Sequence, residues 1–288
     1  MQCNKLNSKP LYYNKMQQTT GLTRTVLDKY YTKPEIAEWC ISHIKTHLSI
    51  QSTDIIIEPS AGNGAFIEYI KPLSNEVILY DIEPENEEIV KQDYLELQYN
   101  HLLNKTVHII GNPPFGRQSS LAIKFIKHSS AFCNSISFIL PKSFKKDSLK
   151  KSFPLKFHLL FECDIPDNSF VVEGVEHDVP CVFQIWQKKP HDRSVAKALI
   201  PTHFEFVSKE EVHDISFRRV GVNAGIIDTN TEEKSKQSHY FIKFTNSCTI
   251  NENLHALSSV SFEFNNTVGP KSISKQELIA KFNSVLTE

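Results

Sequence analysis

Short apolar runs alternate with segments of helical periodicity along the first half of the chain. Four runs of buried type predict strands at residues 55–57, 77–80, 107–110 and 136–140. Helical spacing predicts a helix after Thr32, with Pro34 in its first turn, and further helices at residues 65–70, 119–130 and 143–152. Such alternation predicts a parallel sheet that is covered by helices on both faces.

The pattern changes after Phe157. Two strand-like runs, residues 157–163 and 179–186, predict an antiparallel hairpin at the edge of the sheet. A polar stretch over residues 187–194 predicts a linker. Beyond it we expect short strands at residues 203–207, 239–244 and 260–264. A final helix is predicted over residues 275–285, with Ser274 as its N-cap and Glu277 at the third helical position.

These patterns divide the chain into three parts. Residues 1–20 are polar and aperiodic, which predicts a disordered tail. Residues 21–190 carry the α/β pattern, and residues 200–288 predict a small α+β region. The predicted fold class is therefore α/β, Rossmann-like and doubly wound, with a small C-terminal addition.

Composition limits the environment more than the function. Hydrophobic residues make up 40 % of the 288 residues, yet no segment approaches the ~20 apolar residues of a membrane span. The first residues are polar, so no secretory signal is expected. Six scattered cysteines without CxxC spacing predict reduced thiols and no metal site, in a cytoplasmic or nuclear protein. With a net charge of −1, a nucleic-acid partner would require clustered lysines.

A turn of small residues follows the first predicted strand. Ser60, Ala61, Gly62 and Gly64 would let the backbone approach a ligand closely, although an ordinary strand-to-helix turn has the same appearance. Glu58, at the end of that strand, would repel phosphate and could hold an ammonium group through ordered water. Asp81 ends the second strand, where an acid can accept hydrogen bonds from both ribose hydroxyls of a nucleoside.

The tetrad Asn112-Pro113-Pro114-Phe115 follows the third strand and carries the most specific chemistry. Consecutive prolines fix the backbone and remove two N–H donors, so carbonyls can point into a pocket without competition. The Asn112 amide and a main-chain carbonyl could then accept hydrogen bonds from an exocyclic amine, and Phe115 could stack on the ring that bears it. The alternative is a rigid turn with a buried Phe.

Residues 25–187 resemble the adenine-N6 amino-methyltransferases of the class I fold. The resemblance rests on Asn112–Phe115, which matches the family tetrad [DNS]PP[YFW], and on a segment ending in Tyr31-Thr32-Lys33-Pro34. It rests also on the loop from Glu58 to Gly64, on Asp81, and on Gln92-Asp93-Tyr94-Leu95. The motif order resembles the gamma arrangement of DNA adenine methylases, but the C-terminal part is small for a target-recognition domain.

The resemblance implies a seven-stranded methyltransferase sheet with an antiparallel edge hairpin, and S-adenosylmethionine as cofactor. Its implied catalytic residues are Asn112, Pro113, Pro114 and Phe115. Its implied cofactor-binding residues are Tyr31, Thr32, Pro34, Glu58, Ser60, Ala61, Gly62, Gly64, Asp81, Ile82, Asp93, Tyr94 and Asn112. From pattern alone, Asp93 could equally be a solvated acid, and Tyr31 a core aromatic residue.

Lysines cluster shortly after the fourth predicted strand. We consider Lys142, Lys145 and Lys146, together with Arg117, as candidates for phosphate contacts with a nucleic acid. A solvated helix face explains the same run equally well.

The resulting expectation is transfer of a methyl group to the N6 amine of adenine in nucleic acid, with DNA slightly preferred. Three alternatives stay open. The first is the same reaction on RNA, and the second is methylation of a protein glutamine amide, for which Tyr is typical in place of Phe115. The third is a non-catalytic subunit that keeps the methyltransferase fold. No membrane and no metal partner is expected, and the oligomeric state is left open.

Overall fold

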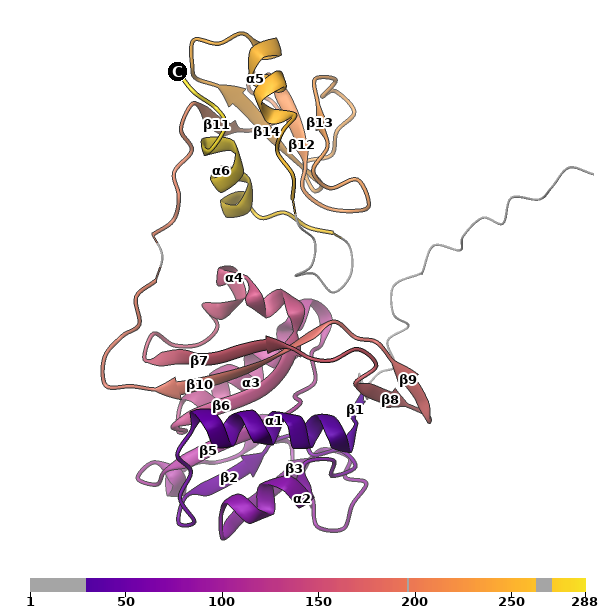
Figure 1. Ribbon diagram of the computed structural model, residues 1–288, viewed down its shortest axis with the longest axis vertical. Helices are drawn as coiled ribbons and strands as arrows, with labels where there is room; N and C mark the ends of the chain where they lie inside the picture. Colours follow the sequence, from indigo (N-terminus) through magenta and orange to yellow (C-terminus); the bar gives the residue numbers. More distant parts are fainter. Residues whose placement is uncertain (1–29, 196, 263–270) are drawn as a thin grey trace, which may run out of the picture.

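The computed structural model describes residues 30–195, 197–262 and 271–288. The predicted tail over residues 1–20 lies outside the described residues, as does the start of the predicted domain at residue 21. Figure 1 shows two bodies joined by an extended connection, with the C-terminal region above a larger α/β body.

The α/β body is built on a seven-stranded sheet. Its strands are β2 (Ile55–Glu58), β3 (Glu76–Asp81), β4 (Val90–Lys91), β5 (Val107–Gly111), β6 (Ser135–Pro141), β7 (Phe157–Asp164) and β10 (Cys181–Lys188). The order is β4-β3-β2-β5-β6-β10-β7, and β10 runs antiparallel to both of its neighbours. The predicted fold class, with its antiparallel edge hairpin, is confirmed. The order reverses between β2 and β5, where ligands bind in open sheets.

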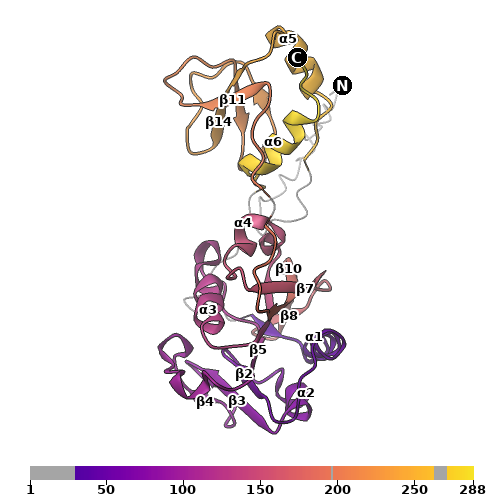
Figure 2. The same cartoon turned by 90° about the vertical axis from the view of Figure 1, so that its left-hand side faces the viewer.

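Helices cover the two faces of this sheet. α1 (Pro34–His47) and α2 (Ile67–Ile70) pack on one face, and α3 (Ser120–Ser130) packs on the other, as Figure 2 shows. α1 begins at Pro34 and buries the residues that its periodicity indicated, Ile36, Ala37, Cys40, Ile41 and Ile44. α2 is one turn long, shorter than predicted, because Gly62 and Gly64 upstream have φ of +54° and +89° and form turns.

The lysine-rich segment does not form the single predicted helix over residues 143–152. A 3-10 helix (Lys142–Lys145) and the one-turn helix α4 (Asp147–Lys150) are separated by Lys146, whose backbone is extended at φ −75° and ψ 136°. Tertiary contacts override helix propensity at this point. Phe144 is fully buried, and the Lys146 Nζ donates to the Ser272 carbonyl at 3.1 Å.

A small hairpin interrupts the connection between β7 and β10. β8 (Phe170–Val172) and β9 (Val175–His177) are joined by a turn at Glu173 and Gly174, both with positive φ, as in the two-residue turns that suit hairpins. β8 also pairs with β1 (Tyr31–Thr32), which lies far away in sequence. The sequence pattern had predicted no strand at these positions.

The C-terminal region has its own sheet and core. β11 (Phe204–Val207), β12 (Ile215–Arg218), β13 (Ile227–Asp228) and β14 (His239–Phe244) form an antiparallel sheet in the order β11-β14-β12-β13. α5 (Ile250–Leu257) and α6 (Lys275–Asn283) each begin with a capping box, and Ser274 and Glu277 form the predicted one. Residues 260–262 are not a strand, and residues 263–264 lie outside the described residues.

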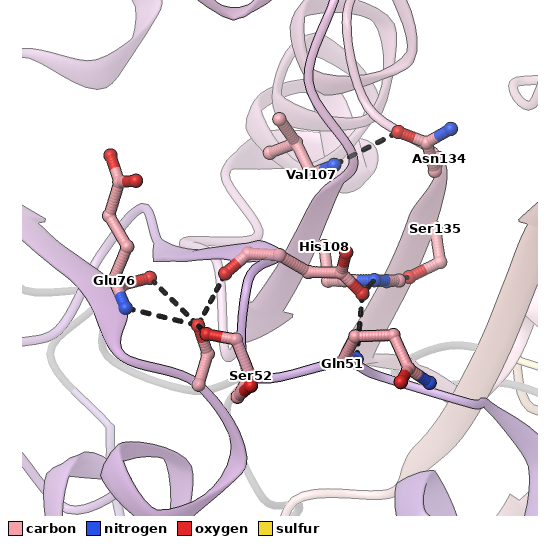
Figure 3. Close-up of polar contacts among 9 residues, drawn as sticks. Gln51, Ser52, Glu76, Val107, His108, Asn134 and Ser135 are labelled. Atoms are coloured by element: carbon pink, nitrogen blue, oxygen red, sulfur yellow. Dashed lines mark hydrogen bonds and ion pairs between the residues drawn. The ribbon is translucent and has the colours of Figure 1, made fainter.

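A buried polar network ties the amino ends of the strands together, on the side away from the tetrad (Figure 3). His108 Nδ1 lies 2.7 Å from Ser135 Oγ, and its Nε2 lies 3.2 Å from Asp54 Oδ2. Asp54 Oδ2 also accepts from the Gln51 N–H at 2.8 Å.

In the described parts of the chain, no helix is long and apolar enough to cross a membrane.

Candidate active site

A cavity of about 720 Å³ opens where β2, β3 and β5 end. This volume is in the range of sites for ligands of nucleoside size. The cavity brings together most of the predicted site residues: Tyr31, Thr32, Glu58, Ser60, Ala61, Gly62, Asp81, Ile82, Asp93, Tyr94, Asn112, Pro113, Pro114, Phe115 and Arg117. Among the predicted and described residues, five lie outside the lining: Pro34, Gly64, Lys142, Lys145 and Lys146.

The glycine turn and Asp81 hold each other in place. Asp81 Oδ2 accepts from the Gly62 N–H, and Oδ1 accepts from the Glu83 N–H, both at 2.8 Å. Gly62 has φ +54°, and an added Cβ would lie 3.3 Å from the Tyr31 ring. Each oxygen of Asp81 uses one lone pair in these bonds and keeps another for a ligand. The carboxylate is therefore fixed at the cavity wall and still able to accept hydroxyl groups.

Glu58 is a buried carboxyl group at the end of β2, with a relative exposure of 2 %. Burial, and secondarily the charge of Asp81, raises its pKa to about 8. Its Oε2 is buried without a hydrogen-bond partner from the described residues. A buried acceptor without a partner costs stability, so a ligand that brings a cationic donor to it gains that interaction.

Asn112 follows β5 directly, and its side chain has a defined orientation. The amide nitrogen donates to the Thr32 hydroxyl oxygen at 3.1 Å and to the Tyr30 carbonyl at 3.3 Å. Both N–H groups are thus used, while Oδ1 is buried without a partner from the described residues. Ser60 Oγ donates to the Asn112 carbonyl at 3.1 Å, which joins the glycine turn to the tetrad. The amide oxygen is therefore a buried acceptor without a partner from the described residues, next to the glycine turn.

Phe115 is held by the backbone of the loop that follows it. Its carbonyl accepts from the N–H groups of Leu121 and Ala122, at the start of α3, at 3.1 and 3.4 Å. Gly116 makes the required turn with φ +67°, and an added Cβ would lie 2.8 Å from Leu121 Cγ. The residues Gln118 and Ser119 also have positive φ, which is costly for non-glycine residues. The chain therefore places Phe115 in the lining through an unusually bent connection.

Asp93 and Tyr94 follow β4 closely in sequence and line one side of the cavity. Asp93 is the N-cap of a 3-10 helix (Tyr94–Glu96), and its Oδ1 accepts from the Leu95 N–H at 2.9 Å. Tyr94 is buried, with its hydroxyl 2.8 Å from Ser129 Oγ on α3. Asp93 is therefore part of the cavity wall rather than a fully solvated acid.

The structure adds lining residues that were not predicted. Phe66, Glu83, Ser120, Leu121 and Phe125 also face the cavity. Leu121 and Phe125 are four residues apart on α3, so helical spacing was an available signal for that pair. Tyr30 lines the cavity as well, and its ring meets His177 of β9 edge-on at 5.9 Å between centroids.

The lysine candidates make protein contacts instead. Lys142 and Lys145 form ion pairs with Asp164 at 3.2 and 2.6 Å. Lys146 contacts Ser272 and Glu277 of the C-terminal region. Their predicted role at phosphates thus gains no support from geometry, whereas Arg117 lies at the cavity. Over the described ranges, no group of three or more His, Cys, Asp or Glu is placed to hold a metal ion.

No protein-family model matches the chain, and no curated protein matches it. Solved structures do. A chain named as a class I S-adenosylmethionine-dependent methyltransferase from Listeria monocytogenes is 14 % identical, with 61 % of this chain and 66 % of that chain covered and a TM-score of 0.45. A chain named as a modification subunit of a type I restriction enzyme from Vibrio vulnificus is 12 % identical, with 56 % and 44 % covered and a TM-score of 0.44.

A dimethyladenosine transferase from Plasmodium falciparum is 19 % identical, with 55 % of this chain and 63 % of that chain covered and a TM-score of 0.39. Each of these matches spans less than two thirds of the solved chain. The chain is structurally similar to class I S-adenosylmethionine-dependent methyltransferases.

Proposed function

We propose that this protein is an S-adenosylmethionine-dependent methyltransferase that methylates the N6 amine of adenine in a nucleic acid. The observation that carries the proposal is Asn112 Oδ1, a buried acceptor without a partner from the described residues, beside the glycine turn. An exocyclic amine has the two donors that such an acceptor and a neighbouring main-chain carbonyl require.

The lining fits the proposed cofactor group by group. Asp81 keeps lone pairs for two ribose hydroxyls, and the Gly62 turn allows close approach of the ligand. Glu58 offers a buried carboxyl oxygen to the ammonium of the amino-acid part. Asp93 and Tyr94 line the same cavity, and in this proposal they hold the adenine of the cofactor. When bound, S-adenosylmethionine supplies a methyl carbon that accepts the lone pair of an amine as its bond to sulfur breaks.

The residues of the tetrad act on the target base. Asn112 Oδ1 and the Pro113 carbonyl accept the two amine hydrogens, and the two prolines fix the backbone that carries this carbonyl. These bonds turn the nitrogen lone pair toward the donor, and Phe115 stacks on the purine. A base in a duplex has to leave its stack to reach such a cavity, at a cost of a few kcal/mol. The residues contribute positioning and electrostatics, and no strong base is needed, because the nitrogen gives up one proton to solvent after its bond to the methyl carbon has formed.

A nucleic-acid target is preferred to a protein glutamine because the tetrad ends in Phe115, whose apolar ring suits stacking on a base. A non-catalytic role is disfavoured because the open acceptors Glu58 and Asn112 remain buried without partners from the described residues, at a cost in stability.

The test is methylation with labelled cofactor of DNA, RNA and protein extracts, followed by digestion to nucleosides and amino acids. We expect N6-methyladenine in a nucleic acid and loss of about 10²-fold or more in turnover for Asn112→Ala, with cofactor affinity nearly unchanged. Label on glutamine would replace the proposal by the protein alternative. Full activity of Asn112→Ala would refute the mechanism, and cofactor binding without methylation of any polymer would indicate a scaffold.

A further inference from the structure

Two cations lie over aromatic rings on the C-terminal region. The Arg219 guanidinium carbon is 5.4 Å from the centre of the Tyr240 ring. Lys275 Nζ is 4.5 Å from the centre of the Phe206 ring and 5.7 Å from that of Tyr240. The two rings meet edge-on at 5.4 Å. We call Phe206, Arg219, Tyr240 and Lys275 the cation–aromatic patch.

Backbone pairing joins the two segments that carry Arg219 and Lys275. The Ile273 N–H donates to the Arg219 carbonyl at 2.8 Å, and the Gly221 N–H donates to the Lys271 carbonyl at 2.9 Å. Residues 219–221 and 271–273 therefore run next to each other. Two segments far apart in sequence supply positive charge to one edge of the region.

Three other lysines of the C-terminal region each pair with a carboxylate. Lys234 pairs with Asp228 at 2.5 Å, Lys243 pairs with Glu205 at 3.7 Å, and Lys236 pairs with Glu210. Within the described residues, by contrast, no ion pair joins a carboxylate to Arg218, Arg219 or Lys275. Glu277 lies nearby, but its carboxylate accepts from the Ser274 N–H and pairs with Lys146. The positive charge of the patch is thus left for a partner, although the chain as a whole is near neutral.

A hydrogen bond from Lys146 connects the α/β body to the segment that carries Lys275. Lys146 Nζ donates to the Ser272 carbonyl at 3.1 Å, between Lys271 and Lys275 in sequence. Lys146 follows β6, whose end lies on the same side of the sheet as the tetrad. Lys275 begins α6, and Figure 1 draws α6 above α4, on the side of the C-terminal region that faces the α/β body.

We propose that the cation–aromatic patch binds the sugar-phosphate backbone of the nucleic-acid substrate. The inference rests on the proposed function for the nature of that substrate. The two rings hold the cations in defined positions, which lowers the entropy cost of a phosphate contact. Partly exposed aromatic rings next to cations are also suited to unpaired bases of a single strand. Anchoring here would hold the polymer while one adenine enters the cavity.

The test compares two double variants of the full chain. Arg219→Gln with Lys275→Gln removes two patch charges, and the control Lys236→Gln with Lys243→Gln removes two charges that are paired elsewhere in the same region. Binding of fluorescent adenine-containing DNA and RNA oligonucleotides is measured over a range of NaCl concentrations. For single strands, the slope of log K against log salt should be about 1.4 less negative in the patch variant than in the wild type. The control should keep the wild-type slope.

In methylation assays the patch variant should raise KM for the polymer roughly tenfold at unchanged kcat. Arg219→Lys with Lys275→Arg keeps both charges and should restore the slope, which separates lost charge from lost folding. An unchanged slope and KM in the patch variant overturn this inference and leave the methyltransferase proposal standing. Binding that depends on the patch, without methylation of the nucleic acid, supports the inference and refutes the proposed reaction. Failure of the wild type to bind either polymer overturns the inference directly.

Discussion

Asn112 donates from its amide nitrogen to the hydroxyl oxygen of Thr32 at 3.1 Å, and its amide oxygen is buried without a partner from the described residues. The Tyr30 carbonyl takes the second amide hydrogen. Thr32 is thus a positioning residue, because it decides which end of the amide meets the target amine.

Replacing the Thr32 hydroxyl should therefore impair turnover selectively. Thr32→Val keeps the shape of the side chain but removes the acceptor, so the amide can rotate and we expect kcat to fall roughly 10- to 100-fold. Thr32→Ser should retain most of the activity. Steady-state kinetics and calorimetry with the cofactor measure both effects. If Thr32→Val and Thr32→Ser have equal kcat, the hydroxyl has no orienting role.

Asp81 should act on cofactor binding rather than on turnover. In Asp81→Asn, one backbone donor, from Gly62 or Glu83, would face an amide NH₂ instead of an oxygen. We expect the Kd for the cofactor to rise roughly tenfold or more, as one charged acceptor is lost. At saturating cofactor, kcat should return close to the wild-type value. A large loss of kcat at saturation would argue against this division of roles.

Glu58 should make stability depend on pH in an unusual direction. Its pKa is about 8 in the folded protein and near 4.5 when exposed, so the folded state retains a proton that the unfolded state has lost. Stability is therefore lost as pH rises from about 4.5 to 8. Glu58→Gln removes this loss, so in urea unfolding between pH 5 and pH 9 the stability of the wild type should fall by about 4 kcal/mol relative to that of the variant.

The same carboxyl group should couple cofactor binding to proton release. A cationic ammonium favours the ionised form, so at pH 7 we expect wild-type protein to release a proton on binding S-adenosylmethionine. Calorimetry in two buffers with different ionisation enthalpies detects this release, and Glu58→Gln should abolish it. Equal proton release in both proteins would show that another group is responsible.

His108 gives the opposite dependence at lower pH. Burial lowers its pKa below 6.5 in the folded protein, although the hydrogen bond and charge of Asp54 act the other way. The unfolded chain then takes up a proton first, so stability is lost as pH falls below 6.5. Urea unfolding between pH 7 and 5 should show a shallower loss for His108→Gln than for the wild type. Parallel curves would mean that His108 does not titrate in this range.

The sequence predicted the elements whose signal is local. β2 and β5 are buried and mostly apolar in sequence, and the carboxyl ends of such strands meet at one edge. This places Glu58, Asp81 and the tetrad in one cavity before any contact is known. The capping box of α6 is likewise local, because Ser274 and Glu277 are three residues apart.

What the sequence did not reveal depends on distant contacts. Strand β8 pairs with β1, yet neither is long enough for a period-two pattern to be recognised. The predicted helix over residues 143–152 failed because Lys146 is drawn to Ser272, which no local propensity records. The Asn112–Thr32 bond also joins distant residues, so the orientation of the amide appears only in three dimensions.

The pairing of β8 with β1 has a consequence for the chain during its synthesis. The glycine turn and the tetrad leave the ribosome before residues 170–172, which secure the strand that carries Thr32. A nascent chain that ends earlier could shape much of the cofactor pocket while its acceptor amide lacks a secured partner. We therefore expect a growing chain to bind the ligand before it can transfer a methyl group. Transfer should begin once the β8–β9 hairpin has been synthesised.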